Sequence, residues 1–376
     1  MHRGLMDRVL VALVGVAIIA GAPFARSAKG APASVPGGWR IVSSPALPGG
    51  ELIGVSALGP GEAWAVGSQA VGGVFAPLAL HWNGSRWSSV PISGPTDFNQ
   101  LRAVSIVSAS NAWAVGVTGQ WGALIEHWNG SSWQIVSSPV SGGQTPLYGV
   151  KAFAANDVWA VGENGSHSLV LHFDGNGWAQ VPVPEPAGSS LTLFGDVDGT
   201  SGSDVWVAGE AETDTQQPLV DHFDASTWTI VPSPPTAGDY SYVRGLDVRT
   251  STDVWMVGDS LGPPPDYTEH PLIQHRVGAT WTAFEGKPGE PWGVAALSAG
   301  DVWVVGNQES PSGDYAAMIE HWDGTAWTFA PSVQSVGTGD SELNDVTALP
   351  NGMVWAVGSY SPRGDDQPLI ELNPSG

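Results

Sequence analysis

The sequence predicts an all-β chain that folds as a seven-bladed β-propeller, with four antiparallel strands in each blade. One unit recurs along the chain at intervals of 46 to 52 residues, a period typical of propeller blades. Apolar runs within the unit are separated by Asn-Gly or Asp-Gly, a strong hairpin signal that favours a type I′ turn. The last unit also lacks its fourth strand, and a matching strand stands alone near the N-terminus.

Each unit contains four recognisable phrases. The first strand resembles Leu-x-Gly-Val-x-Ala, as in 52–58 (LIGVSAL), and the third strand runs into His-aromatic-Asn/Asp, as in 81–84 (HWNG). A degenerate third-strand phrase, HRVG, stands at 275–278. The second strand is [VA]-W-x-[VA]-G, preceded by an acidic or amide residue in six copies, and is centred on Trp64, Trp113, Trp159, Trp206, Trp255, Trp303 and Trp355. The fourth strand starts at Trp39, Trp87, Trp133, Trp178, Trp228, Trp281 and Trp327.

The chain ends predict how the ring closes. The seventh unit stops after its third strand at 368–376, whereas GGWRIVSSP (37–45) has the form of a fourth strand without a preceding unit. We therefore expect the N-terminal strand 38–44 to complete the last blade as its outermost strand. Such closure removes an open sheet edge.

The N-terminus and the composition indicate an exported chain. Residues 9–25 carry no charge and follow a basic start, which is the pattern of a secretory signal. We predict a signal peptide over 1–27, a short linker over 28–36, the propeller over 37–376, and a secreted location, extracellular or periplasmic. An uncleaved anchor is the alternative. The net charge of −23 argues against nucleic acid as a partner, and the chain has no cysteine. We expect no stable membrane association after cleavage, and a monomer.

These phrases resemble those of kelch-type and Asp-box (BNR-like) propeller repeats. VWAVG followed by HFDGNGW matches the kelch order, with one glycine where kelch has two. The HWNGSSW turn is similar to the Asp-box turn and to a phrase of bacterial propeller lectins. The resemblance covers roughly 37–376 and implies the fold. It implies no single activity, because these families include lectins, sialidases, oxidases and scaffolds.

Motifs that would indicate catalysis or a metal lack their context. GDSLG (258–262) matches an esterase phrase, but it follows a predicted strand without any helix signal. The repeated histidines should lie around the ring instead of converging, so we interpret them as structural or surface groups. DVDGTSGSD (196–204) places glycine where a calcium loop needs a ligand. We predict no metal site, no cofactor and no catalytic residue, and interpret the repeated tryptophans as packing between blades.

The loops between second and third strands vary, and the aromatic residues gather on their side. A rigid scaffold with variable loops is where binding residues concentrate. One first-strand position near the channel mouth also varies, occupied by Ile53, Arg102, Tyr148, Phe194, Arg244, Trp292 and Asn344. The residues we predict to bind ligand are Trp121, Tyr148, Asp239, Tyr240, Tyr242, Asp266, Tyr267, Trp292, Tyr315 and Tyr360.

Three functions remain open from the sequence. The first is a secreted, non-catalytic module that binds a carbohydrate or an extracellular protein through the variable loops. The second is an extracellular glycan-acting hydrolase or lyase that uses loop carboxylates, which would have to lie about 5–9 Å apart. The third is a structural or assembly scaffold.

Overall fold

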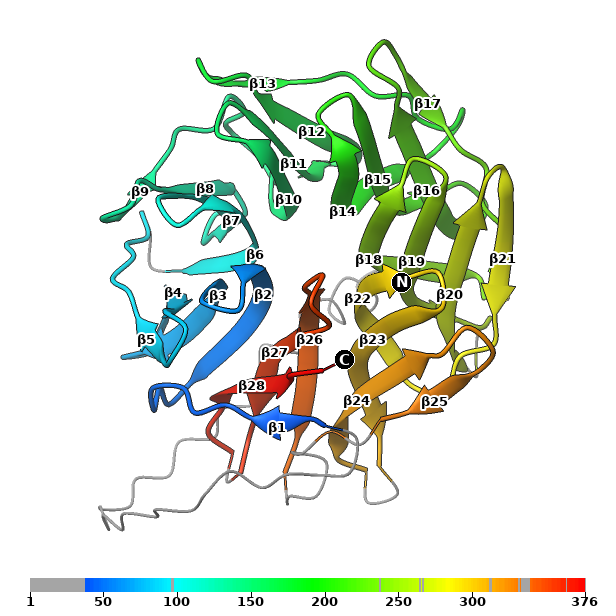
Figure 1. Ribbon diagram of the computed structural model, residues 1–376. Coiled ribbons are helices and arrows are strands. Elements are labelled where there is room, and N and C mark those ends of the chain that lie inside the picture. Colours follow the sequence, from blue (N-terminus) through cyan, green and yellow to red (C-terminus); the bar gives the residue numbers. More distant parts are fainter. Residues whose placement is uncertain are drawn as a thin grey trace. The chain divides into compact units, whose positions relative to one another are not determined.

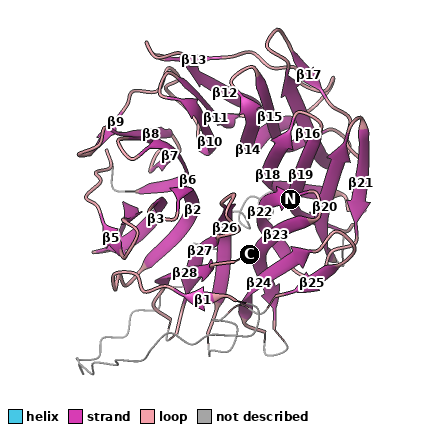
Figure 2. Cartoon of the chain, in the orientation of Figure 1, coloured by secondary structure: helices cyan, strands magenta, loops and turns pink. Residues whose placement is uncertain are grey.

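The computed structural model describes residues 38–375, apart from 96–97, 237, 264, 266, 311–312, 331, 333–338 and 363. The predicted signal peptide (1–27) and linker (28–36) lie outside the described residues. The described part consists of strands and connections without helices (Figure 2). Accordingly, it contains no helix of a length and hydropathy that would cross a membrane.

The strands form five sheets of four strands and one of eight (Figure 1). The first two sheets are β2 (Gly50–Gly59), β3 (Glu62–Val71), β4 (Val74–Trp82), β5 (Trp87–Ser89), and β6 (Asn99–Ser108), β7 (Asn111–Thr118), β8 (Ala123–Trp128), β9 (Trp133–Ile135). The third is β10 (Leu147–Ala154), β11 (Asp157–Asn164), β12 (His167–Phe173), β13 (Trp178–Gln180). The eight-stranded sheet is β14 (Leu191–Ser201), β15 (Asp204–Glu212), β16 (Gln216–Phe223), β17 (Trp228–Ile230), β18 (Tyr240–Thr250), β19 (Asp253–Leu261), β20 (Glu269–Val277), β21 (Thr280–Phe284). The last two are β22 (Glu290–Ser298), β23 (Asp301–Glu309), β24 (Tyr315–Trp322), β25 (Trp327–Phe329), and β26 (Ser341–Ala348), β27 (Val354–Tyr360), β28 (Gln367–Asn373), β1 (Arg40–Ile41).

Strands within each sheet follow the chain and pair antiparallel. The eight-stranded sheet consists of two such runs, β14 to β17 and β18 to β21, joined by one parallel pair between Gln216 and Tyr240. The first strands of the runs, which we call the inner strands, contact one another in the order β2, β6, β10, β14, β18, β22, β26, and β26 contacts β2 (Figure 1). The inner strands of the described part therefore form a closed circle.

The core lies between neighbouring sheets and is built by the repeated tryptophans. The second-strand Trp64 and the fourth-strand Trp133 of the next sheet meet edge to face, with centroids 5.0 Å apart. The same contact recurs in the pairs Trp113–Trp178, Trp159–Trp228, Trp255–Trp327, Trp303–Trp39 and Trp355–Trp87. Edge-to-face pairs are favourable beyond the area they bury. The prediction that these tryptophans pack between blades is confirmed at the level of neighbouring sheets.

The repeated histidines are structural groups. Five of them pair with the acidic residue that begins the second strand, as His222 Nε2 does with Asp204 Oδ1 at 2.7 Å. The imidazole also lies over the second-strand indole, as in the stack of His222 on Trp206. In the degenerate phrase, Arg276 replaces the aromatic residue, and its guanidinium lies 4.9 Å from the Trp206 ring centroid.

The turns between third and fourth strands differ from the type I′ turn expected. In 83–86 only Gly84 has positive φ (86°), whereas type I′ needs two such residues. The Asn83 side chain makes up the difference, because its Oδ1 accepts the amides of Ser85 and Arg86 at 3.1 Å. Ala225 occupies the glycine position of the fourth such turn at φ 72°.

The N-terminal strand β1 belongs to the sheet that the C-terminal strands form. Arg40 and Ile41 pair with Leu372 and Glu371 of β28, so β1 is the outermost strand of the order β1-β28-β27-β26. The indole of Trp39, just before β1, is fully buried against Trp303. The strand is only two residues long, but the contacts around it fix both ends of the described chain.

Candidate binding site at the loop-side end of the inner strands

Every inner strand contains a β-bulge near its start. The register shifts between Leu52 and Gly54 in β2, and at the equivalent place in the other six inner strands. The bulged residues are Ile53, Arg102, Tyr148, Gly195, Arg244, Trp292 and Asn344. A bulge redirects a side chain out of the regular alternation. The varying first-strand position is therefore a bulge position, on the side of the loops between second and third strands, which we call the loop face.

One residue of this set differs from the expectation. Phe194 pairs with Gly209 as Leu52 pairs with Gly67, and it is fully buried, so the bulged residue of β14 is Gly195. The expected position fell one residue early because the glycine of this unit stands at the bulge, whereas Gly54 of β2 stands after it.

The bulged side chains meet acidic residues from the ends of the second strands. We call this set the bulge cluster: Glu51, Arg102, Tyr148, Glu163, Glu210, Tyr242, Arg244, Asp259, Glu290, Trp292, Asn307, Glu342 and Asn344. Electrostatic interactions link its members from one inner strand to the next, including Glu51 with Arg102 and with Glu342. The cluster therefore surrounds the axis of the inner-strand circle.

Two cation–aromatic groups organise the cluster. On β6 and β10, the Arg102 guanidinium lies 5.1 Å from the Tyr148 ring centroid, and the Tyr148 hydroxyl donates to Glu163 Oε1 at 3.0 Å. On β18 and β22, the Arg244 guanidinium lies 4.0 Å from the Trp292 ring, and Arg244 Nε donates to Asp259 Oδ1 at 2.8 Å. Cation–π contacts of this kind orient the guanidinium as well as stabilise it.

The remaining members are held by amide and hydroxyl donors. Asn344 Nδ2 donates to the Leu52 carbonyl at 2.8 Å and to Glu51 Oε1 at 3.4 Å. Glu210 Oε2 accepts the Val243 amide at 3.3 Å. These contacts join neighbouring runs of strands, β26 to β2 and β15 to β18, so the closed circle of runs helps to hold the cluster.

Burial raises the pKa of several of these carboxyl groups to near neutral pH. It raises the pKa of Glu210 to about 8 and, together with Asp259, the pKa of Glu290 to about 7. Burial followed by the charges of Glu342 and Asp366 also raises the pKa of Glu51. Desolvation penalises a carboxylate that lacks a positive partner. These carboxyl groups therefore ionise at a higher pH than exposed carboxyl groups do.

Aspartates farther along the inner strands brace the circle and are not available to a ligand. Asp196 Oδ2 and Asp198 Oδ2 accept the amides of Leu246 and Val248 on the next inner strand, at 2.9 and 2.7 Å. The DVDG segment is therefore part of strand β14. The described residues hold no group of three or more His, Asp or Glu side chains suited to a metal ion.

The structure brings only some of the predicted residues together. Tyr148, Tyr242 and Trp292 belong to the bulge cluster, and Tyr240 lies at the start of β18 beside Tyr242. Asp239 joins two segments by its backbone, since its carbonyl accepts the Gln216 amide. Asp266 lies outside the described residues.

The other predicted aromatics lie apart from the cluster, in loops or at strand ends. Trp121 and Tyr267 have positive φ in their loops, at 58° and 42°. Tyr315 begins β24 and is 45% exposed, and Tyr360 ends β27, partly buried against the core. These four residues lie in or directly beside four different connections between second and third strands.

The acidic residues near the ends of the second strands were not among the predicted site residues. Glu163, Glu210 and Asp259 all occupy the position after the repeated Val-Gly or Ala-Gly. The signal was available, because that position holds Ser68, Val117, Glu163, Glu210, Asp259, Asn307 and Ser359 while the residues before it are nearly constant.

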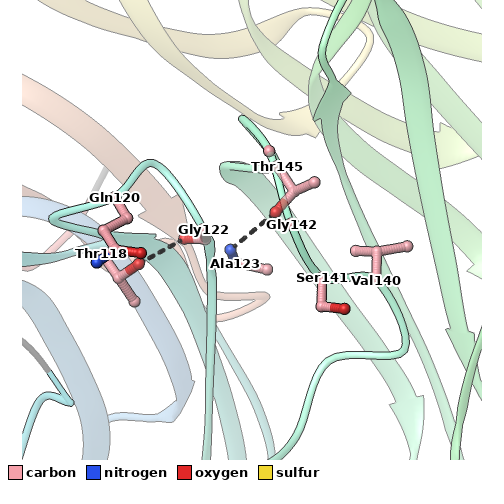
Figure 3. A pocket seen from close by; sticks show the side chains of 9 residues that line it. Thr118, Gln120, Gly122, Ala123, Val140, Ser141, Gly142 and Thr145 are labelled. Carbon is pink, nitrogen blue, oxygen red and sulfur yellow. Dashed lines mark hydrogen bonds between the residues drawn. The ribbon is translucent and has the colours of Figure 1, made fainter.

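A separate pocket of about 240 Å³ opens between the β7–β8 loop and the segment before β10 (Figure 3). Its walls are glycines and short polar side chains, including Thr118, Ser141 and Thr145. The Thr118 and Thr145 hydroxyl oxygens already bond to the adjoining backbone, at Gly122 and Ala123. Few polar groups are left to recognise a ligand, so the bulge cluster is the stronger candidate.

Comparisons with known proteins support the fold. No family model and no curated protein matches the sequence. Among solved structures, the chain is similar to the RRP9 WD40 repeats (TM-score 0.60, 12% identity, 92% of this chain and 99% of that chain). It is similar to YCF48 bound to D1 peptide (0.58, 14%, 92% and 99%), and to the SapL1 lectin in complex with alpha methyl fucoside (0.50, 13%, 79% and 98%). At these identities the likeness concerns the fold alone, and the chain has a β-propeller repeat fold.

Proposed function

We propose that the chain is a non-catalytic binding module that recognises a carbohydrate or an extracellular protein through the bulge cluster and the surrounding loop face. The observation that carries the proposal is the contrast between positions. Between the sheets the tryptophans and histidines repeat, whereas at the bulge the seven inner strands present one glycine and six side chains of five kinds. A repeated scaffold needs no such variety, and a recognition site does.

The finer features of the fold belong to the same proposal. We infer seven blades, counting the two runs of the eight-stranded sheet as two, and closure of the last blade by β1. The kelch-like and Asp-box-like phrases support this reading. We also propose that the chain is secreted after cleavage of residues 1–27 and acts as a monomer. Among the similar structures, one contains a peptide and one a fucoside, and both are propellers.

A binding screen tests the function. The purified full chain is presented to arrays of glycans, cell-wall polysaccharides and peptides, beside the Tyr242→Ala/Trp292→Ala double variant. A matched control is Phe329→Ala, which removes a 45% exposed aromatic from the outer strand β25. We expect specific binding by the parent and by the control, and loss of binding in the double variant.

Two outcomes would contradict this function. Turnover of a polysaccharide by the parent would favour the glycan-acting enzyme. Absence of any ligand, together with unchanged behaviour of the double variant, would favour the scaffold.

A further inference from the structure

The charge of the bulge cluster is unbalanced. Six carboxyl groups face two guanidinium groups, those of Arg102 and Arg244, and both guanidiniums already lie against aromatic rings. Arg244 also pairs with Asp259 at 2.8 Å. Within the described part of the chain, Glu51, Glu210, Glu290 and Glu342 form no ion pair. Carboxyl groups therefore outnumber positive charges in the bulge cluster by three to one.

An independent observation concerns the Asn307 side chain. Asn307 on β23 is the counterpart of Glu163, Glu210 and Asp259, and its Cα partner is Glu290. It is 6% exposed, and its Oδ1 is buried without a hydrogen-bond partner among the described residues. The three counterparts each accept a hydrogen bond, from Tyr148, Val243 and Arg244 respectively. A buried unpaired acceptor costs about 1–3 kcal/mol, so a donor from outside the chain would stabilise it.

One chemical group meets both needs. Ammonium and guanidinium groups carry N–H donors, no acceptor and a positive charge. A sugar hydroxyl would satisfy Asn307 but would leave the carboxyl groups without a positive partner. Lysine and arginine side chains present these groups at the end of a long flexible stem, which suits a site recessed among strands. The net charge of −23 also favours encounter with basic partners.

We propose that the bulge cluster binds the ammonium or guanidinium group of a basic peptide segment, received by Asn307, Glu210 and Glu290. This inference deepens the proposed function and rests on it. Arg244 interacts electrostatically with both Glu210 and Glu290. Its guanidinium lies 4.0 Å from the Trp292 ring centroid, so the chain itself already places one cation against an aromatic face here.

The test uses the full chain and a fluorescently labelled peptide of alternating glycine and lysine, blocked at both ends. The matched probe is the same peptide with every lysine acetylated, which removes the charge and keeps the length. Fluorescence anisotropy at low and high salt gives Kd. We expect acetylation to weaken binding at least about tenfold, and high salt to weaken it as well.

Variants locate the binding. Glu210→Gln/Glu290→Gln should weaken the lysine peptide about tenfold or more, and Gln mimics the shape of the protonated acid. Asn307→Asp should tighten binding several-fold by adding a charge at the orphaned acceptor. The control Asp214→Asn/Glu285→Gln removes the same charge from exposed positions and should change Kd less than about twofold. Thermal melts by tryptophan fluorescence verify that each variant is folded.

The results separate this inference from the function on which it rests. Equal weakening by the control pair would mean non-specific steering and would overturn the inference. So would equal binding of the acetylated peptide. A neutral glycan that binds and is lost in Trp292→Ala, while the lysine peptide does not bind, overturns the basic-peptide inference and leaves the binding function standing. Failure of every glycan and peptide overturns both.

Discussion

Replacing Trp39 by alanine tests whether β1 is an integral part of the fold. The indole is fully buried between β26–β28 and Trp303, with the two ring centroids 5.4 Å apart. A buried tryptophan removes about 150–250 Å² from water, and about 25 cal/mol per Å² then gives about 4–6 kcal/mol. Truncations of buried aromatics cost about 3–5 kcal/mol. We therefore expect Trp39→Ala to lower the free energy of unfolding by about 4 kcal/mol.

The matched control is Trp87→Ala. Trp87 is the fourth-strand tryptophan of the β2–β5 sheet, 4% exposed, and it meets Trp355 edge to face at 5.3 Å. Each indole meets the second-strand tryptophan of the preceding sheet edge to face, and Trp87 also contacts Trp82, with centroids 5.8 Å apart. Urea unfolding followed by tryptophan fluorescence and by circular dichroism should give equal losses for both variants. Domains of this kind have about 5–15 kcal/mol of stability in all, so the loss is easily measured.

The reasoning fails if Trp39→Ala unfolds at the parental urea midpoint while Trp87→Ala loses several kcal/mol. Residues before β2 would then be an accessory tail. Deletion of 37–45 is a harsher form of the same test. It exposes the edge of β28 and should leave a chain that aggregates or does not fold.

Three further predictions concern the rest of the scaffold. Burial raises the pKa of Asp221 to about 7, so the folded state keeps a proton that the unfolded state releases near pH 4. The free energy of unfolding should therefore fall as pH rises from 5 to 8. Urea unfolding at each pH should show a smaller fall for Asp221→Asn. Ala225→Gly should stabilise the chain by about 0.5–1 kcal/mol, because glycine adopts the positive φ of this turn without steric strain. Gly175→Ala, in the corresponding turn, should destabilise it by a similar amount. Thermal melts test both variants. Arg276→Met should keep the packing on Trp206 but lose the cation–π contact, about 1 kcal/mol by the same melts.

The repeats made the sheets predictable because each strand type carries its own phrase. The [VA]-W-x-[VA]-G and His-aromatic-Asn/Asp phrases pair directly, with Trp64 opposite His81 and Trp113 opposite His127. The acid that pairs with the histidine was visible in the sequence as well. Its role follows only from the antiparallel register, which places Glu62 beside His81.

The candidate site was less predictable because a bulge interrupts the alternation of side chains between the two faces of a strand. Glycine marks the residue after the bulge in β2, where Gly54 lies against the backbone of Ala103, but in β14 an aspartate stands there instead. The contact between Arg244 and Trp292 joins two units, and no local pattern in either unit encodes it. Sequence identified three of the aromatic residues of the cluster and none of its carboxyl groups.

Equivalent positions in the seven units can be compared with one another, and the comparison shows where the fold accepts an apolar residue in place of a buried polar one. The third-strand position before the histidine holds Leu80 and Leu171 in two units, and Glu126, Asp221 and Glu320 in others, all buried. An apolar side chain is thus compatible with the fold at that position. Among the acids there, Glu320 Oε1 accepts the Lys287 amide, whereas the two Asp221 oxygens are buried without a hydrogen-bond partner among the described residues.

The bulge cluster differs, because its buried acids adjoin one another around the axis and raise one another's pKa. Like charges gathered in this way reduce stability, and apolar or amide residues at the same positions, such as Val117 and Asn307, are equally compatible with the strand. A fold selected for stability alone would replace Glu210 or Glu290 at little cost. The persistence of four carboxyl groups without an ion pair, beside an unpaired Asn307 oxygen, is therefore best explained by a positively charged ligand that offsets the cost when it binds.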